Sequence, residues 1–562
     1  MTEQEKYNYW LEQKDLDAEV LSQLKAIEGN ETEIFESFYK DLEFGTAGLR
    51  GILGAGTNRM NIYTVGKASD GFAKYLKENF KSPSIAIAYD SRINSQLFAW
   101  VSARIMAKNG IKVYIYNELM PTPMLSYAVR YYKCDGGIVI TASHNPAKYN
   151  GYKVYGSDGC QAGPEMADAI LSYINKTDMF KVQLAEKDDK NINIIPDSVI
   201  ESFIETILKK RVYEDKDAVK NLNIVYTPLN GTGMMPVDRV MKKMGVENMT
   251  VVKEQQNPDG NFPTCAYPNP EYREALEKGL ELLEKTKGDI LIATDPDADR
   301  VGVAVKHNDE FRLITGNEMG VLMLDYICRA KTLNGTMPKH PVAVKTIVTT
   351  AMVDAVCQKY NVKLESVLTG FKFIGGVIAE LEENNRVEDY LLGFEESYGY
   401  LLGEHVRDKD AVSAVMLIAD MTAYYKSKGK TLVDVLEDMF KEFGYYENKT
   451  ATFAFEGASG LEKMGALMEQ LRNCPPKTVA GADIIEISDY KLSITKNQQG
   501  ETPITLPKSN VLAYKLSDGC SFVVRPSGTE PKLKIYMFVK AETSDKARDR
   551  LAELYSALEN IS

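Results

Sequence analysis

The chain has 562 residues, of which 44% are hydrophobic and 26% are charged, as in ordinary globular proteins. A chain of this length exceeds a single hydrophobic core, so we expect about three to five domains. The formal net charge of −12 argues against nucleic acid and anionic membranes as partners, because both bind basic surfaces, but a small anionic substrate stays possible.

Strand patterns alternate with helical patterns over most of the length, which predicts an α/β fold. Residues 85–89 are typical of a buried strand, residues 97–108 have the apolar spacing of a helix, and residues 113–116 are typical of the next strand. The same order begins again with the strand patterns at residues 224–227 and 342–344. We therefore expect three related α/β units.

Three further predicted strands each lead into a polar loop. The strands and the residues that follow them are 137–141 with Ser143, 289–293 with Asp295, and 389–393 with Glu395. Ligands of open α/β sheets bind at the carboxyl ends of the strands. We expect the three loops to converge on one site, because packing alone does not explain matched loops with different chemistry.

The C-terminal part has a different pattern, which predicts a smaller α+β domain. A helix is expected over residues 461–471 and another from about residue 544, with short strands between them at 484–487, 511–514, 522–524 and 533–539. The loop at Arg525 joins two of these strands. The predicted domains cover residues 1–205, 206–317, 318–447 and 448–562.

Ser143 directly follows an apolar strand and precedes Asn145-Pro146, which cannot continue a helix, so we expect it at an exposed turn. Two interpretations stay open, a turn that only reverses the chain and a nucleophilic or phosphorylated serine. The Gly-x-Ser-x-Gly pattern of acyl-transfer enzymes is absent. His144 is expected to be a poor base, because neighbouring side chains in an extended loop point apart. Lys153 could supply a cation or a proton-transfer group.

Asp295, Asp297 and Asp299 alternate along one loop, so their carboxylates are expected on one side of it. Such carboxylates repel one another without a cation, which favours a hard metal ion. An EF-hand is excluded, because Arg300 and Lys306 occupy the positions that require Gly and Glu. A solvated acidic turn is the alternative, but the loop follows a fully apolar strand. Three carboxylates leave room on Mg²⁺ for a phosphate oxygen.

The loop with Glu395, Glu396 and Ser397 places paired carboxylates beside a hydroxyl, which suits the vicinal hydroxyls of a sugar. A glycosidase acid/base pair is the rival interpretation, but adjacent residues rarely bracket a glycosidic bond.

The loop that begins at Arg525 combines an arginine fork, two hydroxyls and a glycine turn, which together suit a phosphate group. An ordinary Pro-Ser-Gly turn is the alternative. The spacing of a Walker loop is absent. A glycine-rich loop at residues 44–51 presents Arg50 and is a weak signal by itself.

The seven cysteines are scattered and include no Cys-x-x-Cys pair, which argues against a disulfide framework and a zinc site. No apolar run approaches the roughly 20 residues needed to span a bilayer. The first residues lack the layout of a signal peptide. These features together favour a cytoplasmic enzyme.

Taken in order, five segments resemble the α-D-phosphohexomutase family. They are Thr-Ala-Gly-Leu-Arg at 46–50, Thr-Ala-Ser-His-Asn-Pro at 141–146, Asp-Pro-Asp-Ala-Asp-Arg at 295–300, Glu-Glu-Ser at 395–397, and Arg-Pro-Ser-Gly-Thr-Glu-Pro at 525–531. The resemblance extends from about residue 40 to the end. Residues 393–397 read Gly-Phe-Glu-Glu-Ser where much of the family has Gly-Glu-x-Ser, and Tyr398-Gly399 stands where some members place Gly-His. Proton transfer by a histidine is therefore not expected at this loop.

The resemblance implies three similar α/β domains and a C-terminal α+β phosphate-binding domain around a central cleft. It also implies a phosphorylated serine and a role for each matching residue. The implied residues are Ser143, Arg50, Lys153 and Lys409 in catalysis; Asp295, Asp297, Asp299 and the phosphoserine at Mg²⁺; and Arg300, Glu395, Ser397, Arg525, Ser527, Gly528 and Thr529 in substrate binding.

The implied reaction is the interconversion of glucose 1-phosphate and glucose 6-phosphate through a bisphosphate, with glucose 1,6-bisphosphate as activator. The sugar loop is most similar to the bacterial α-phosphoglucomutase branch and is also similar to the phosphopentomutase branch, so mannose and ribose phosphates stay alternatives. A serine-based metal phosphatase is an alternative of another class, but it would not need the Arg525 loop. A non-catalytic sugar-phosphate sensor would tolerate loss of Ser143 or of an aspartate, and all are present.

Overall fold

A computed structural model describes residues 1–45, 48–213, 216–455, 460–527 and 532–559. The chain forms two compact units. The first is built from Met1–Pro341 and Phe371–Thr431, and the second from Val342–Gly370 and Leu432–Ser562. Among the described residues, no helix combines the length and the apolar character that crossing a membrane requires.

Unit 1 begins with three short helices that the sequence patterns did not predict. Each starts at a polar N-cap residue whose side chain accepts a hydrogen bond from the first turn. The helices are α1 (Glu3–Leu11), α2 (Ala18–Ala26) and α3 (Glu31–Phe38). They pack around Trp10, which contacts the rings of Phe38, Tyr63 and Phe180. The helices thereby cover the region that follows strand β1.

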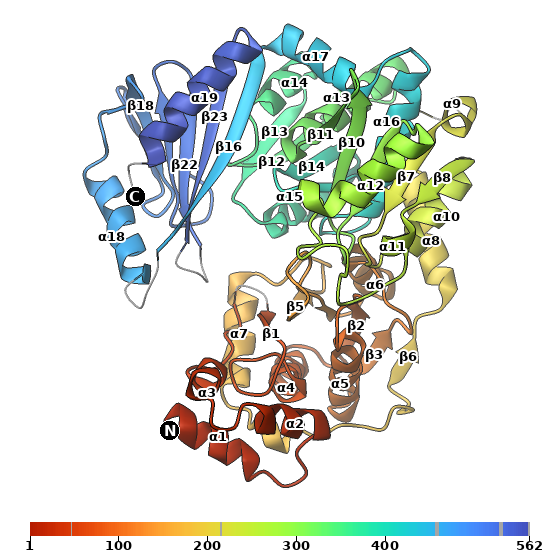
Figure 1. Ribbon diagram of the computed structural model, residues 1–562, viewed down its shortest axis with the longest axis vertical. Helices are drawn as coiled ribbons and strands as arrows, with labels where there is room; N and C mark the ends of the chain where they lie inside the picture. The colour runs from red at the N-terminus through yellow and green to blue at the C-terminus, as the bar shows by residue number, and fades with distance from the viewer. Residues whose placement is uncertain (46–47, 214–215, 456–459, 528–531, 560–562) are drawn as a thin grey trace. The chain divides into compact units, whose positions relative to one another are not determined.

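The first sheet of unit 1 has the order β1-β5-β4-β2-β3-β6 (Figure 1). Its central strands are parallel, whereas β1 and β5 run antiparallel at one edge. The strands are β1 (Gly48–Ile52), β2 (Ser84–Tyr89), β3 (Lys112–Ile115), β4 (Gly136–Ile140), β5 (Tyr149–Gly156) and β6 (Ile192–Ile194). The helices are α4 (Ile62–Asn79), α5 (Ser95–Lys108), α6 (Thr122–Tyr132), α7 (Pro164–Ile174) and α8 (Asp197–Leu208). The predicted strands and helix of this region are confirmed.

A second sheet in unit 1 has the order β11-β10-β9-β7-β8. Strands β7 and β9 are parallel, and β10 returns antiparallel to β9. The strands are β7 (Asn223–Thr227), β8 (Asn248–Val251), β9 (Ile290–Thr294), β10 (Val301–His307) and β11 (Glu310–Ile314). The accompanying helices are α9 (Lys216–Lys220), α10 (Met234–Met244), α11 (Lys253–Gln256) and α12 (Arg273–Thr286). The turn between β9 and β10 carries the three aspartates.

The remainder of unit 1 contains a hairpin and three long helices. They are α13 (Gly316–Leu333), α15 (Phe371–Glu383), β14 (Tyr390–Glu395), β15 (Gly399–Leu401) and α16 (Ala411–Lys426). Helix α16 is buried on nearly every side, as expected of a helix that is apolar all round. It packs against β9, β10, α10 and α13, and so ties this hairpin region to the second sheet.

Unit 2 contains the parallel strands β12 (Val342–Thr346) and β13 (Lys363–Val367), with helices α14 (Met352–Tyr360) and α17 (Leu432–Phe443). Its large antiparallel sheet has the order β16-β23-β22-β21-β18-β19-β20, and α19 lies against β16 and β23 (Figure 1). The strands are β16 (Tyr445–Ala454), β17 (Thr478–Val479), β18 (Ala482–Asp489), β19 (Ile494–Asn497), β20 (Gly500–Pro503), β21 (Leu512–Leu516), β22 (Ser521–Pro526) and β23 (Lys532–Ala541), with α18 (Gly460–Asn473) and α19 (Ser544–Glu559). The predicted C-terminal α+β arrangement is confirmed.

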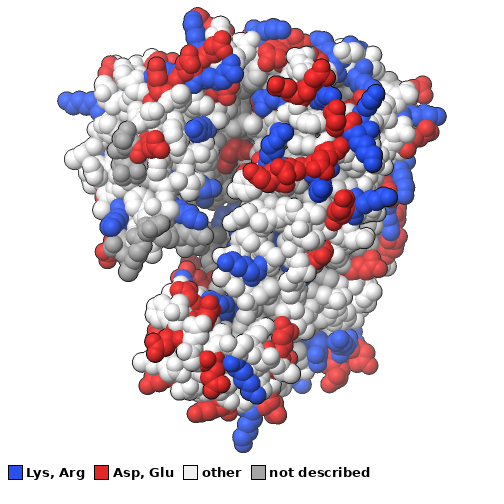
Figure 2. Space-filling model, in the orientation of Figure 1, with Lys and Arg blue, Asp and Glu red and all other residues white. Residues whose placement is uncertain are grey.

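The surface charges and the cysteines of the structure can be compared with what the sequence predicted. Acidic and basic side chains are intermixed over the visible face (Figure 2). The seven cysteines all lie in the described part of the chain and are free thiols, so the prediction against a disulfide framework is confirmed.

Candidate active site

Ser143 lies in the loop that follows β4, at the carboxyl end of a buried strand. Its backbone is left-handed, with φ of 51°, and its N–H donates to Thr141 Oγ1 at 2.8 Å. The serine is only 4% exposed, so the expectation of an exposed turn was wrong. A non-glycine residue in this backbone region is strained, and such strain concentrates at functional sites.

The Ser143 hydroxyl meets groups from its own loop and from the metal loop. Its Oγ donates to Asp295 Oδ2 at 2.9 Å and lies 3.1 Å from His144 Nδ1. The expectation that His144 would point away was wrong, because the left-handed backbone of Ser143 breaks the extended geometry that it assumed. Burial, together with the nearby cations Arg300 and Arg50, holds the pKa of His144 well below its usual value. Burial and these cations therefore favour the neutral ring over the protonated one.

The three aspartates form a tight turn between β9 and β10 and not the extended loop assumed from their spacing. The N–H of Ala298, which has φ of 47°, donates to Asp295 O at 2.9 Å. The N–H groups of Asp299 and Arg300 both donate to Asp295 Oδ1 at 3.0 Å. The predicted cluster is nevertheless present, because one oxygen from each aspartate lies within 4.8 Å of the others.

Two neighbouring segments fix this turn from outside. Thr232 N–H and Oγ1 both donate to Pro296 O, at 2.8 and 2.9 Å. A side chain at Gly231 would come within 2.3 Å of Pro296 Cα, so glycine allows this close approach. From α6, Thr122 donates its N–H to Asp297 O at 2.9 Å and its hydroxyl to Asp297 Oδ2 at 3.0 Å. The turn therefore has little freedom to move.

Cationic side chains surround the aspartates. Lys153 Nζ lies 3.1 Å from Asp297 Oδ2, and Lys409 Nζ lies 3.0 Å from Asp299 Oδ2. Burial would raise the pKa of Asp297, but Lys153 holds it below its usual value. Burial and the other two carboxylates raise the pKa of Asp295 well above its usual value. The aspartates thus repel one another despite the lysines.

Carboxylate oxygens in the turn between β9 and β10 indicate whether a metal ion would fit there. Asp297 Oδ1 and Asp299 Oδ1 are buried and have no hydrogen-bond partner in the part of the chain that the structure describes. Leaving a buried carboxylate oxygen unpaired is costly, because it has lost its water. Oxygen ligands from clustered carboxylates are those that Mg²⁺ prefers. The residues present therefore fit a divalent cation bound by Asp295, Asp297 and Asp299.

Strands β1 and β5 bring two further predicted residues to the same part of unit 1. Arg50 pairs with Gly151, and Gly48 pairs with Lys153, in an antiparallel register. Lys153 reaches Asp297, as described above, while Arg50 lies close enough to His144 to lower its pKa. Both cations are therefore placed around the serine and metal loops.

The predicted sugar loop is the hairpin turn between β14 and β15. Glu395 is the last residue of β14, and Ser397 lies in the turn. Val301 N–H donates to Tyr398 O at 3.1 Å, which joins the hairpin to β10. A side chain at Gly399 would come within 2.2 Å of Lys409 Cδ, so this glycine makes room for the lysine stem. The third loop thus meets the metal turn, which in turn meets the serine loop through Asp295.

Arg300 lies between the metal turn and the sugar loop. Its guanidinium donates to Glu271 at 2.8 Å, and its backbone forms a bridge with Gly399. Burial would lower the pKa of Arg300, but Glu271 and Asp299 raise it above the usual value. Glu271 was not predicted, because it lies before α12 and carries no motif.

The predicted phosphate loop belongs to unit 2, at the end of β22. Arg525 pairs with Lys534 of β23, and Ser527 N–H donates to Lys532 O at 2.7 Å. Gly528 and Thr529 lie outside the described residues. Arg525 and Ser527 therefore lie where β22 leads into the loop of the hairpin that it forms with β23.

Three other contacts near the site were not predicted. Tyr155 OH donates to Asp408 Oδ2 at 2.6 Å, and Asp408 Oδ1 lies 3.1 Å from Lys409 Nζ. Arg92 donates to the loop that carries Ser143. Arg92 follows β2 at the same sheet edge as Ser143, so the argument from strand ends could have found it.

Sequence profiles of one family match four successive segments of the chain. They are those of phosphoglucomutase/phosphomannomutase alpha/beta/alpha domain I at residues 41–181, domain II at 201–308, domain III at 315–443, and the C-terminal domain at 482–555. The chain belongs to the phosphoglucomutase/phosphomannomutase family. This membership confirms the resemblance seen in the sequence and the predicted fold of three α/β domains followed by a different C-terminal domain.

Individual members of the family match most of the chain. A phosphoglucomutase of Staphylococcus haemolyticus is 37% identical over 518 residues, which is 91% of this chain and 92% of the relative. A phosphoglucomutase of Staphylococcus aureus is 35% identical over 522 residues, which is 92% of this chain and 93% of the relative. Family members of this kind are isomerases, which confirms the prediction of an enzyme.

Solved structures agree with the fold. Parafusin from Paramecium matches with a TM-score of 0.67 at 18% identity, covering 93% of this chain and 96% of that one. A phosphoglucomutase/phosphomannomutase family protein from Burkholderia thailandensis matches with a TM-score of 0.66 at 17% identity, covering 92% and 97%.

Proposed function

We propose that the protein is a phosphoglucomutase that interconverts glucose 1-phosphate and glucose 6-phosphate through a phosphoserine at Ser143. The observation that carries this proposal is the 2.9 Å contact between Ser143 Oγ and Asp295, because it joins the serine loop to the acidic turn in one buried site. The relatives at 37% and 35% identity are named phosphoglucomutases, which supports glucose as the sugar.

In the forward half-reaction, the phosphorus–oxygen bond to Ser143 breaks while a bond forms from phosphorus to the free hydroxyl of a sugar monophosphate. The electron pair of the broken bond stays on Ser143 Oγ, and the proton lost by the sugar hydroxyl is balanced by one gained there. Two groups could carry this proton. One is His144, whose Nδ1 lies 3.1 Å from Ser143 Oγ, and the other is Lys153, which contacts Asp297 in the same site. The bisphosphate then returns its other phosphate to Ser143.

The metal site serves this reaction through charge. Asp295, Asp297 and Asp299 would hold Mg²⁺, which when bound neutralises charge on the transferring phosphoryl group. Arg50 and Lys153 add positive charge from β1 and β5. Burial of Ser143 excludes water, which would otherwise compete with the sugar hydroxyl for the phosphoryl group.

Substrate binding is divided between two groups of residues. Glu395 and Ser397, with Arg300 and Lys409, would bind the sugar. Arg525 and Ser527, with Gly528 and Thr529, would hold the phosphate that does not react. Glucose 1,6-bisphosphate would restore any enzyme that has lost its phosphate, which accounts for its expected role as activator.

The test is phosphorylation and turnover of a Ser143→Ala variant. We expect intact mass to show one phosphate on the wild type after incubation with glucose 1,6-bisphosphate and none on the variant. Mutase activity of the variant should fall by more than about 10⁴-fold, because the phosphate carrier is gone. Ser157→Ala, at an exposed serine of the same domain, is the matched control and should keep full activity. An active Ser143→Ala enzyme would exclude the mechanism.

The choice of sugar is tested by rates on glucose 1-phosphate, mannose 1-phosphate and ribose 1-phosphate measured side by side. We expect the largest kcat/KM for glucose 1-phosphate. Release of free phosphate at the rate of isomerisation would instead identify a phosphatase.

A further inference from the structure

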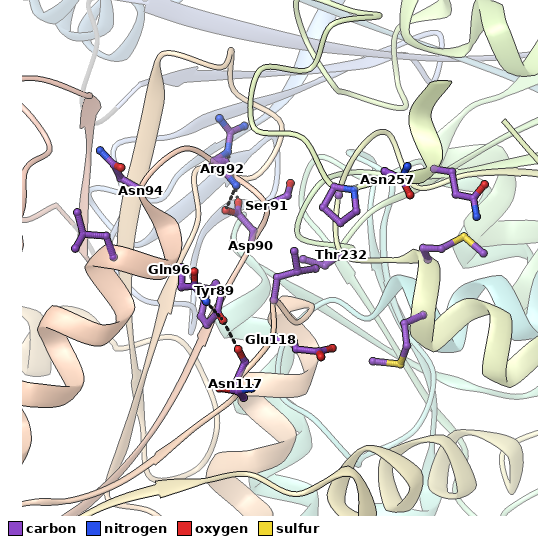
Figure 3. Close-up of a pocket in the computed structure, with 17 residues that line it drawn as sticks. Tyr89, Asp90, Ser91, Arg92, Asn94, Gln96, Asn117, Glu118, Thr232 and Asn257 are labelled. Atoms are coloured by element: carbon purple, nitrogen blue, oxygen red, sulfur yellow. Dashed lines mark hydrogen bonds and ion pairs between the residues drawn. The ribbon is translucent and has the colours of Figure 1, made fainter. Parts of the chain in front are cut away.

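Arg92 is a buried cation directly behind the loop that carries Ser143. It follows β2, is 3% exposed, and lines a cavity of about 790 Å³ whose other walls include Asn117 and Thr232 (Figure 3). Burying a guanidinium is costly unless its N–H groups are satisfied. The partners that satisfy this one therefore indicate what it does.

Among the described residues, the two terminal nitrogens of the guanidinium donate to backbone oxygens of the phosphoserine loop and its exit strand, whereas Nε has no hydrogen-bond partner. Its Nη2 donates to Ser143 O at 2.5 Å and also to Asn145 O. Its Nη1 donates to Pro146 O and Tyr149 O, both at 3.0 Å. One planar side chain thus fixes four carbonyl groups over seven residues, including the carbonyl of the serine itself.

Arg92 is itself held by its neighbours. Asp90 Oδ2 lies 3.4 Å from Arg92 Nε, and Asp90 Oδ1 accepts from Arg92 N–H at 2.9 Å (Figure 3). Ser95 Oγ donates to the same Asp90 oxygen at 2.7 Å and accepts from Asn150 Nδ2 at 3.0 Å. The aromatic ring of Phe262 faces the guanidinium at 5.0 Å. The arginine is therefore rigid and can impose its geometry on the loop.

The loop needs such a constraint. A left-handed serine persists only where its surroundings over-determine it, since the strain is about 1 to 3 kcal/mol. Phosphoryl transfer in turn depends on in-line placement of the serine oxygen. Hydrogen bonds within the loop involve other groups: Ser143 N–H donates to Thr141 Oγ1 at 2.8 Å, and Asn145 N–H donates to Ala142 O at 3.1 Å. The carbonyl of Ser143 instead accepts from Arg92.

We propose that Arg92 is a positioning residue for phosphoryl transfer at Ser143: its guanidinium holds the loop carbonyls so that Ser143 Oγ faces the acidic turn. This rests on the proposed mutase function. The residue touches neither sugar nor phosphate in this scheme, so its loss should lower the rate of transfer and leave substrate affinity nearly unchanged.

The test compares three variants with the wild type. Arg92→Lys keeps the charge but cannot reach four carbonyls from one planar group. Its kcat should fall by about 100-fold, as for a misplacement near 1 Å, while KM for glucose 1-phosphate changes less than about threefold. The rate of Ser143 phosphorylation by glucose 1,6-bisphosphate, followed by intact mass, should fall in parallel. Ser91 lines the same cavity, and its hydroxyl has no hydrogen-bond partner among the described residues. Ser91→Ala is therefore the control and should match the wild type.

Ser95→Ala covers the case in which Arg92→Lys does not fold. It keeps the guanidinium but removes both hydrogen bonds of Ser95 Oγ, the one to Asp90 and the one from Asn150. Its kcat should fall by at least about fivefold at constant KM, because each such bond contributes about 1 kcal/mol. A folded Arg92→Lys with wild-type kcat would overturn the proposal, and so would an unfolded Arg92→Lys together with an unchanged Ser95→Ala. A purely structural role would lower the folded fraction without changing the rate per folded molecule. A wild type without mutase activity would instead overturn the proposed function.

Discussion

The chemical centre in unit 1 and the Arg525 loop in unit 2 are held in different ways. In unit 1, Ser143 and the three aspartates are buried in left-handed or tight turns, and side chains such as Thr122 and Arg92 fix the backbone around them. In unit 2, Arg525 is the last residue but one of a regular strand, and its described support is the pairing of β22 with β23.

This difference indicates which contacts determine the rate of phosphoryl transfer and which determine the affinity for the substrate. Groups that transfer a phosphoryl group need fixed geometry, which strained turns and buried hydrogen bonds supply. A loop that only binds a phosphate group needs positive charge and the position that the end of a strand provides. Substitutions in unit 1 should therefore act mainly on kcat, and those in the Arg525 loop mainly on KM.

Apart from Ser143→Ala, the largest effect is expected at the acidic turn. Asp297→Asn removes one carboxylate charge from the proposed metal site and should lower kcat by roughly 10³-fold, because the metal's charge stabilisation is worth several kcal/mol. Treatment of the wild type with EDTA should abolish activity, and Mg²⁺ should restore it. Asp309→Asn, at an exposed aspartate of the same domain, is the control. Full activity in EDTA would contradict a metal role.

A smaller effect is expected in unit 2. Arg525→Lys loses the planar fork and should raise KM for glucose 1-phosphate by about 30-fold, since a charged hydrogen bond contributes about 2 kcal/mol. Steady-state kinetics measure it, with Arg548→Lys on α19 as the control. If Arg525→Lys lowered kcat and left KM unchanged, the Arg525 loop would not act mainly on affinity as proposed.

The next effect concerns the support of a metal ligand. Thr122→Val removes the hydroxyl that binds Asp297 Oδ2 and should weaken Mg²⁺ affinity by about 10-fold, as for other outer partners of ligands. Titration of activity and of bound metal with Mg²⁺ measures the change. Thr122→Ser keeps the hydroxyl and should restore most of the affinity; equal affinities of the Val and Ser variants would speak against the contact.

The smallest effect is expected at Tyr155. Tyr155→Phe removes the hydrogen bond to Asp408, which in turn contacts Lys409. We expect kcat to fall by about fivefold, because one neutral donor contributes about 1 kcal/mol. Tyr131→Phe, at an exposed tyrosine of α6, controls for the loss of a hydroxyl. An effect larger than that of Asp297→Asn would contradict the ranking.

Strand ends were the most informative feature of the sequence. The apolar runs before Ser143, Asp295 and Glu395 predicted three buried strands, and the structure brings the loops after them together. This succeeds because burial and strand direction are encoded locally. The predicted domain boundaries and the roles assigned to the site residues stay predictions.

Local patterns failed where backbone shape depends on distant contacts. Ser143 and Ala298 both have left-handed φ. Ser143 O accepts a hydrogen bond from Arg92, and Pro296 O, in the turn of Ala298, accepts one from Thr232, and each donor lies more than 50 residues away in the sequence. Spacing alone therefore gave an exposed turn and an extended loop. Helices α1, α2 and α3 were missed for another reason, because each is so short that it offers little helical periodicity.

The backbone of Ser143 also restricts which residue can carry the phosphate. Threonine has the same hydroxyl, but a β-branched side chain is a genuine outlier at φ of 51°, and left-handed geometry costs an ordinary residue about 1 to 2 kcal/mol. Over evolutionary time, exchange of serine for threonine at this position would be selected against by the shape of the main chain, although both could be phosphorylated.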